Sequence, residues 1–153
     1  MSFRKDNKFG EIGENKISKY ILSLPITMGI VDVSKDECFQ QFDIDFLQIT
    51  TDGDINKIEV KTDKIADKTG NMVYEKYSNK QYFTKGCFEK TKADYIFYYL
   101  ININVIYIFN TQELIQWVWE HEHEYELVDM GDSASGYIIK LSDLKDISIK
   151  KKI

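Results

Sequence analysis

Cysteine, the residue on which small exported domains and many metal sites depend, is scarce in this sequence. Only two of the 153 residues are cysteines, Cys38 and Cys87, and neither has a second thiol at metal-ligand spacing. This scarcity argues against a disulfide framework or a cysteine-based zinc site. We interpret both cysteines as ordinary small side chains.

Long apolar runs are also absent. No run approaches the roughly 20 residues that span a bilayer, and the first ten residues lack the apolar core of a signal peptide. The longest apolar stretch, Tyr95 to Phe109, is interrupted by Asn102 and Asn104. We therefore expect a cytoplasmic protein with no membrane partner. Without repeats or linker-like segments, residues 1–153 are predicted to form a single domain.

A basic excess is missing as well, because the net charge is −5, which argues against a nucleic-acid partner. The charge is nevertheless unevenly distributed. Nine lysines and five acids lie between Lys57 and Lys92, whereas seven acids and no lysine or arginine lie between Asn110 and Asp132. The first region could meet phosphate, and the second would face away from it.

The hydrophobic pattern predicts an α/β fold with a mixed central sheet flanked by helices. Helices are expected over Glu11–Leu24, ended by Pro25, and from Thr111 to about Glu122, capped by Asn110 or Thr111. Strands are expected over the following segments: Phe42–Thr50, Ile58–Lys61, Met72–Tyr77, Ala93–Leu100, Asn104–Phe109 and Gly136–Leu141.

The first two strands form a predicted hairpin around an Asp-Gly turn, and each has one apolar and one charged face. Because residues two apart share a face of a strand, Asp43 and Asp45 point the same way, as do Glu59 and Lys61. If the charged faces coincide, carboxylates and an ammonium converge at one end of the sheet. The alternative is a solvated hairpin face with no chemical role.

Such a group suits phosphodiester hydrolysis. Carboxylates supply the oxygen ligands that Mg²⁺ prefers, and the ion lowers the pKa of a bound water. A lysine beside them can orient that water and stabilise negative charge. At about 100° per residue, Glu14 lies at the edge of the core-facing side of its helix, whereas Glu11 lies farther round the helix from that side. Glu14 can therefore reach the same site.

Asp45, thirteen intervening residues and then Glu59-Val60-Lys61 resemble the Asp…Glu-x-Lys core of the PD-(D/E)XK nuclease superfamily. Gly13-Glu14 followed by Tyr20-Ile21-Leu22 is similar to the opening helix of its Holliday-junction-resolvase-like members. The superfamily also includes restriction endonucleases and phage exonucleases, so the resemblance implies a restriction-endonuclease-like fold and a phage or mobile-element setting.

By this resemblance, Asp45, Glu59 and the Val60 carbonyl would hold Mg²⁺ or Mn²⁺, Lys61 would act on the attacking water, and Glu14 would be an accessory acid. Ile44 stands where proline is common in the superfamily. Asp43 could replace Asp45 as the ligand, although the apolar run after Asp45 favours the latter.

The implied activity is a metal-dependent endonuclease acting on DNA as a homodimer, with RNA left open. The alternative is an inactive nuclease-fold domain that binds nucleic acid or protein. Basic residues interleaved with aromatics after the site could track phosphates or could form a solvated surface; the candidates are Lys64, Lys68, Lys76, Lys80 and Lys85.

The second predicted helix carries a pair of tryptophans and a pair of histidines, and we interpret both pairs as structural. Trp117 and Trp119 could stack bases, but Trp119 falls in the apolar stripe and is predicted to be core. His121 and His123 diverge by about 200° on a helix and are unsuited to hold one metal together.

Overall fold

A computed structural model describes the backbone of residues 3–153 and the side chains of residues 8–153. The chain order of the helices and strands is as follows: α1 (Phe3–Ser23), β1 (Thr27–Asp32), α2 (Glu37–Gln40), β2 (Phe46–Thr50), β3 (Ile55–Asp63), α3 (Ala66–Thr69), β4 (Asn71–Asn79), β5 (Thr84–Lys85), α4 (Cys87–Lys90), β6 (Tyr95–Leu100), β7 (Val105–Asn110), α5 (Thr111–His121), the 3-10 turn η1 (Glu122–Glu124), β8 (Val128–Gly131), β9 (Ala134–Lys140), η2 (Leu141–Leu144) and β10 (Ser148–Lys152).

The central sheet has six strands in the order β1-β2-β3-β6-β7-β10. Neighbouring strands are antiparallel except β3 and β6, which run parallel because the chain leaves the sheet between them. That excursion forms β4 and β5 of a second, four-stranded sheet in the order β5-β4-β9-β8. Strand β3 is therefore central, with a partner strand on each side.

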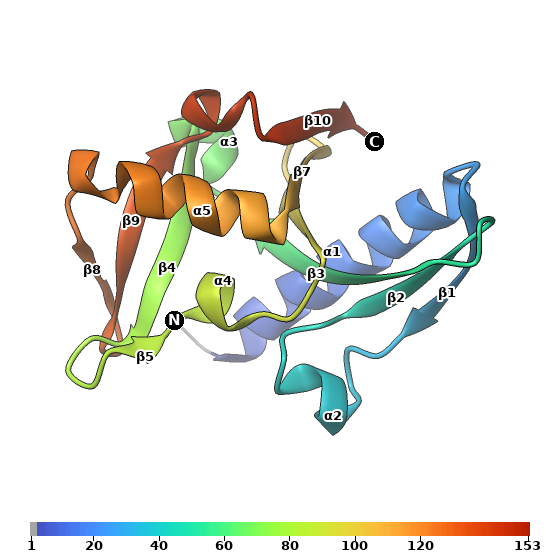
Figure 1. The fold of residues 1–153 in the computed structure, drawn as a ribbon, viewed down its shortest axis with the longest axis horizontal. Helices are drawn as coiled ribbons and strands as arrows, with labels where there is room; N and C mark the ends of the chain where they lie inside the picture. The colour runs from blue at the N-terminus through green and yellow to red at the C-terminus, as the bar shows by residue number, and fades with distance from the viewer. Residues whose placement is uncertain (1–2) are drawn as a thin grey trace.

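Helix α1 covers one face of the central sheet. Its Ile17 and Ile21 are fully buried against Ile58 and Val60 of β3 and against residues of β2, β6 and β7. These residues recur at helical spacing in α1 and at alternate positions in β3, so one periodic apolar stripe meets another. Figure 1 shows α1 behind β1, β2 and β3.

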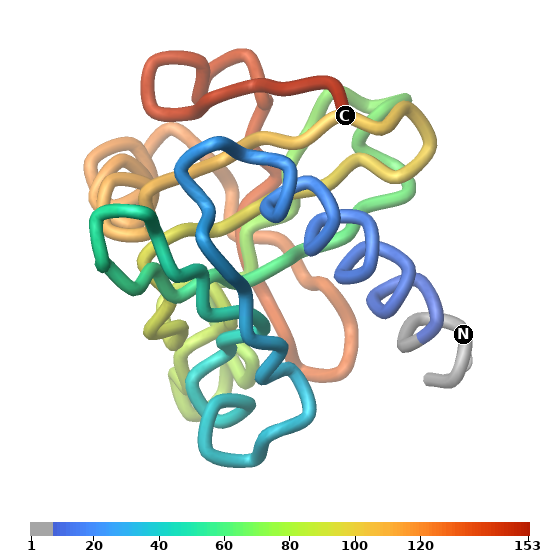
Figure 2. The backbone as a smooth tube through the Cα atoms, turned by 90° about the vertical axis from the view of Figure 1, so that its right-hand side faces the viewer, coloured from blue at the N-terminus to red at the C-terminus, as the bar shows by residue number. Residues whose placement is uncertain are grey.

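The opposite face of the sheet carries α5, α4 and the four-stranded sheet. Leu114 and Val118 of α5 are buried with Ile96 and Phe109 of the central sheet and with Tyr74 of β4. Figure 2 shows the same separation, with α1 and α5 on opposite sides of the central strands. The result is a central layer covered on both faces.

The predicted fold class, a mixed sheet flanked by helices, is confirmed. Both predicted helices are present, although α1 begins earlier than Glu11. Asn110 caps α5, because its side chain accepts hydrogen bonds from the backbone N–H groups of Gln112 and Glu113. None of the helices in the described part of the chain is long and apolar enough to span a bilayer.

The prediction of a strand over Phe42–Thr50 is wrong in its first four residues, since β2 begins at Phe46. Residues 41–43 form a turn in which Asp43 has φ 52°. This left-handed conformation is incompatible with a strand, although aspartate tolerates it better than most residues. Strands β1, β5, β8 and β10 were not among the predicted elements.

Candidate active site

Asp45 immediately precedes β2, at the point where the pairing between β2 and β3 stops while β3 continues. We call this point the β2–β3 fork. The ladder between the two strands ends at the pair Phe46–Ile58, and the Asp45 N–H then donates to the Ile58 carbonyl at 2.9 Å. The Asp45 Oδ2 atom accepts a hydrogen bond from the Val60 N–H at 2.7 Å. The Asp45 side chain thus supplies the hydrogen bond to Val60 that a further backbone pair of the β2–β3 ladder would have made.

The Val60 carbonyl also faces the β2–β3 fork. The N–H and C=O of one residue point to the same side of a strand, and the Val60 N–H points to Asp45. Because β2 has no rung beyond Phe46, the carbonyl lies on the open side of β3. This backbone oxygen and the Asp45 carboxylate therefore share one edge.

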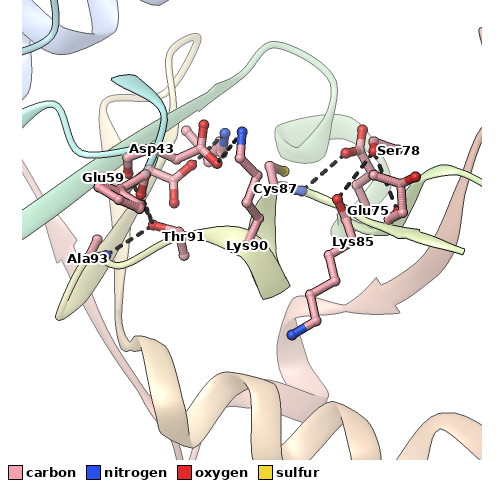
Figure 3. Close-up of polar contacts among 12 residues, drawn as sticks. Asp43, Glu59, Glu75, Ser78, Lys85, Cys87, Lys90, Thr91 and Ala93 are labelled. Atoms are coloured by element: carbon pink, nitrogen blue, oxygen red, sulfur yellow. Dashed lines mark hydrogen bonds and ion pairs between the residues drawn. The ribbon is translucent and has the colours of Figure 1, made fainter. Parts of the chain in front are cut away.

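Glu59 and Lys61 project from β3 on the face opposite α1. Glu59 is only 1% exposed, and its Oε1 lies 2.6 Å from the Lys61 Nζ. Its Oε2 is buried and has no hydrogen-bond partner among the described residues. The nearby Thr91 hydroxyl lies 3.0 Å from the backbone carbonyl of Asp43, to which it donates (Figure 3), and it also acts to lower the pKa of Glu59.

The electrostatics of this pair follow from burial and proximity. Burial raises the pKa of Glu59 to about 7, although the Lys61 ammonium opposes the rise. Burial lowers the pKa of Lys61, but the Glu59 carboxylate more than compensates, so that the net pKa lies above its ordinary value. The side chain of Lys61 is 30% exposed. Lys61 is therefore a fixed cation that solvent can reach.

Asp43 joins this group from the turn that precedes β2. Thr91 and the Lys92 N–H hold the turn through hydrogen bonds to its carbonyl oxygens. The negative charge of Asp43 contributes to the raised pKa values of both Glu59 and Asp45. Lys90 extends from α4 toward Asp43, with its Nζ 3.7 Å from Oδ2 (Figure 3). The sequence predicted Asp43 only as an alternative ligand, and it placed Lys90 in the basic stretch after the site rather than beside Asp43.

Glu14 reaches the site because Gly13 brings α1 very close to β3. A Cβ on Gly13 would lie 1.8 Å from the Thr62 Oγ1, so only glycine permits this approach. Burial, followed by repulsion from Asp45 and Asp32, raises the pKa of Glu14 to about 7. Glu14 thus lies beside Asp45.

The structure therefore divides the acidic and basic residues of the site into two groups that meet at Asp45. Glu14 and Asp32 lie on one side, and Asp32 was missed because β1 was not predicted from the sequence. Glu59 and Lys61 lie on the other side of β3. Burial raises the pKa of Asp45, while the Lys61 ammonium acts to lower it and Asp32 to raise it. Asp45 is thus influenced by charges on both sides.

Within the described residues, no three His, Cys, Asp or Glu side chains form a group that could hold a metal ion. Two oxygen donors, the Asp45 carboxylate and the Val60 carbonyl, lie at the β2–β3 fork. A third, the Glu59 carboxylate, belongs to the neighbouring residue of β3 and pairs with Lys61, whose charge also acts on Asp45. Mg²⁺ often binds through one or two carboxylates and keeps several waters. The buried, unpartnered Oε2 of Glu59 is the feature that such an ion would satisfy, so the donor set fits Mg²⁺ or Mn²⁺.

The five lysines predicted to contact nucleic acid do not form one track. Lys64 lies beside the site, in a pocket of about 380 Å³ that Lys61 also lines. Lys68 is exposed on α3, and Lys85 is exposed on β5. Lys76 is largely buried and ion-paired with Glu122, and Lys80 lies 2.8 Å from Asp129. The acidic stretch therefore neutralises part of the basic stretch.

Of the two tryptophans, Trp117 packs against the core and Trp119 faces solvent. Trp117 is partly buried against the core and stacks on His121, with ring centroids 4.2 Å apart. Trp119 was predicted to be core, but it is 60% exposed. The apolar stripe was wrong at this position because Leu114, Ile115 and Val118 already fill the contact with the sheet.

The six-stranded mixed sheet and the helices on both of its faces define a mixed α/β protein. No protein-family model and no curated protein matches the sequence. Among solved structures, the chain is similar to a bacterial homing endonuclease, I-Ssp6803I, with a TM-score of 0.51 and 18% sequence identity over 72% of each chain. This similarity shows a shared fold.

Proposed function

We propose that this chain is a divalent-metal-dependent nuclease that hydrolyses phosphodiester bonds, and specifically a DNA endonuclease of the PD-(D/E)XK type. The observation that carries the proposal is the grouping of Asp45, Glu59 and Lys61 around the β2–β3 fork. The similarity of the fold to that of a homing endonuclease supports it. DNA is the proposed partner.

In this proposal, Asp45, Glu59 and the Val60 carbonyl hold Mg²⁺ or Mn²⁺. When bound, the ion supplies an acidified water and offsets phosphate charge. Lys61 stays protonated because it lies beside Glu59, so it orients the attacking water and stabilises negative charge that develops on the phosphate. Glu14 acts as an accessory acid beside Asp45.

A second candidate function is that of a nuclease-fold domain that binds nucleic acid or protein without cutting. Two observations favour it: the net charge of −5, and the pairing of Lys76 and Lys80 with acidic residues. Both features weaken the nonspecific attraction to phosphate on which many nucleases depend. The two functions differ in whether metal binding depends on the Asp45 and Glu59 carboxylates.

The deciding experiment is a cleavage assay on linear duplex, single-stranded DNA, a four-way junction and RNA, with Mg²⁺ or Mn²⁺. We expect cutting that is abolished in Glu59→Ala and reduced at least about 100-fold in Lys61→Ala. Lys151→Ala, which removes an exposed lysine on β10, is the matched control and should cut normally.

Calorimetric titration with Mn²⁺ completes the test. The enzyme requires metal binding that weakens in Asp45→Ala and Glu59→Ala but persists in Lys61→Ala. A folded protein that cuts none of the substrates and binds no metal would instead support the binding domain.

We also propose a homodimer, because so small a domain offers little surface for reading a duplex. Sedimentation equilibrium measures the oligomeric state directly.

A further inference from the structure

An open groove of about 770 Å³ lies next to the candidate site. Its walls come from the start of β3, from β5 and α4, from the segment 91–95, and from one side of α5 that includes Trp119. Thr91 lines this groove, and its hydroxyl also holds the turn that carries Asp43. The groove therefore adjoins the turn that carries Asp43.

Trp119 lies in this groove with an unusual combination of exposure and fixed orientation. It is 60% exposed, yet its indole Nε1–H donates to the Glu89 Oε1 at 2.9 Å. This hydrogen bond ties the ring to α4 and limits its rotation. A fixed, solvent-facing aromatic ring is a platform on which a planar group can stack.

The walls of the groove carry three lysines and three acids, which are Lys57, Lys85, Lys92, Asp54, Glu89 and Asp94. Lys57 lies 4.0 Å from Asp94, and Glu89 is engaged by Trp119. Lys85 and Lys92 also line the groove and are exposed, and no ion pair is found for either ammonium among the described residues. In Figure 3, Lys85 extends away from Asp43 and Glu59 toward α5.

We propose that this groove binds an unpaired segment of a nucleic-acid strand, with a base stacked on Trp119 and phosphates on Lys85 and Lys92. A concave groove of this volume admits individual bases, whereas a duplex keeps its base faces stacked and out of reach. Single-stranded segments are recognised by aromatic platforms combined with cations in this way.

This inference deepens the proposed function, on which it rests, because it names the substrate class. The contact at Thr91 places the unpaired segment beside the turn that carries Asp43. The preferred substrate is therefore a duplex that adjoins a single-stranded flap, overhang or branch, with the cut made near the junction between paired and unpaired nucleotides.

The test is quenching of tryptophan fluorescence by oligo(dT), measured without divalent metal on the full chain. We expect quenching in the wild type and in Trp117→Phe, but not in Trp119→Phe. Oligo(dT) affinity, measured by anisotropy of a labelled oligonucleotide, should fall about tenfold or more in Trp119→Ala and partly recover in Trp119→Phe. Lys85→Ala and Lys92→Ala should each weaken binding and its salt dependence, whereas Lys151→Ala should not.

Two outcomes would overturn the inference: oligo(dT) affinity unchanged in Trp119→Ala, or equal quenching of Trp119 by a blunt duplex and by oligo(dT). The Glu59→Ala variant keeps this result separate from the proposed function. If oligo(dT) quenches Trp119 but neither the wild type nor any variant cuts DNA, the groove assignment is correct and the proposed nuclease activity is wrong. If the wild type cuts DNA but Trp119 is not involved in binding, the nuclease stands and the groove assignment fails.

Discussion

At the scale of single residues, two lysines pair with two different carboxylates of the site and do so with different geometry. Lys61 is held by a buried carboxylate, with Oε1 of Glu59 at 2.6 Å. Lys90 is half exposed, and its partner Asp43 is 3.7 Å away. The first is fixed by the fold, while the second can exchange its carboxylate for a phosphate oxygen.

This difference predicts different kinetic effects for the two lysines. Lys90→Ala should raise KM for DNA roughly tenfold and leave kcat almost unchanged, because one charged contact to bound substrate is lost. Lys61→Ala should chiefly lower kcat. Steady-state cleavage kinetics with both variants measure the difference, and a large fall in kcat for Lys90→Ala would show that Lys90 acts in the chemical step.

The sequence predicted some of these residues and missed others for identifiable reasons. Alternation places Glu59 and Lys61 on one face of a strand, and that local rule holds in β3. Asp43 breaks the rule because it adopts a positive φ, which alternation cannot reveal. Lys90 lies far from the motif in the sequence, and only the packing of α4 against β4 and α5 brings it near Asp43.

At the scale of elements, the position of α1 depends on one glycine. Gly13→Ala should destabilise the protein by about 1–3 kcal/mol, because the new methyl group collides with Thr62 of the central strand. In an ordinary helix the same change would be stabilising. Thermal unfolding of the variant measures the sign.

Gly10→Ala is the matched control for this prediction. Gly10 lies in the same helix, and a Cβ there would meet nothing within 4 Å. It should therefore raise stability by about 0.5–1 kcal/mol. If both variants are stabilised, the close contact between α1 and β3 does not exist in solution.

Elements at the edges of the sheets were hardest to predict. Strand β10 has the sequence SIKKK and lies at the edge of the central sheet beside β7. Lysines on an edge strand discourage pairing with another chain, but they also make the segment look like a polar tail. The strands that were predicted are those whose buried residues recur with a period of two or form apolar runs.

At the scale of the whole molecule, the carboxylates of the site oppose stability at high pH. The pKa values of Glu14 and Glu59 are raised to about 7 in the folded state from 4.5. The folded protein therefore binds protons more tightly than the unfolded chain. This contribution is fully present below the unfolded pKa and is lost as pH rises through 7.

We therefore predict that the metal-free protein has a lower Tm at about pH 8 than at about pH 5.5, by roughly 5 °C. Scanning calorimetry in a chelator measures the difference, which should shrink in a Glu14→Gln/Glu59→Gln double variant. A Tm that rises across this interval would contradict the assignment. Saturating Mn²⁺ at high pH should recover the loss in the wild type alone.

The contrast between the two thiols has a practical consequence for spectroscopy. Burial raises the pKa of Cys87 to about 11, whereas Cys38 is exposed on α2. The thiolate is the form that alkylating reagents attack, so a maleimide dye should modify the natural chain at Cys38 alone. That label would lie five residues before Asp43 in the sequence. It would therefore place an optical reporter near the turn that carries Asp43, without any mutation.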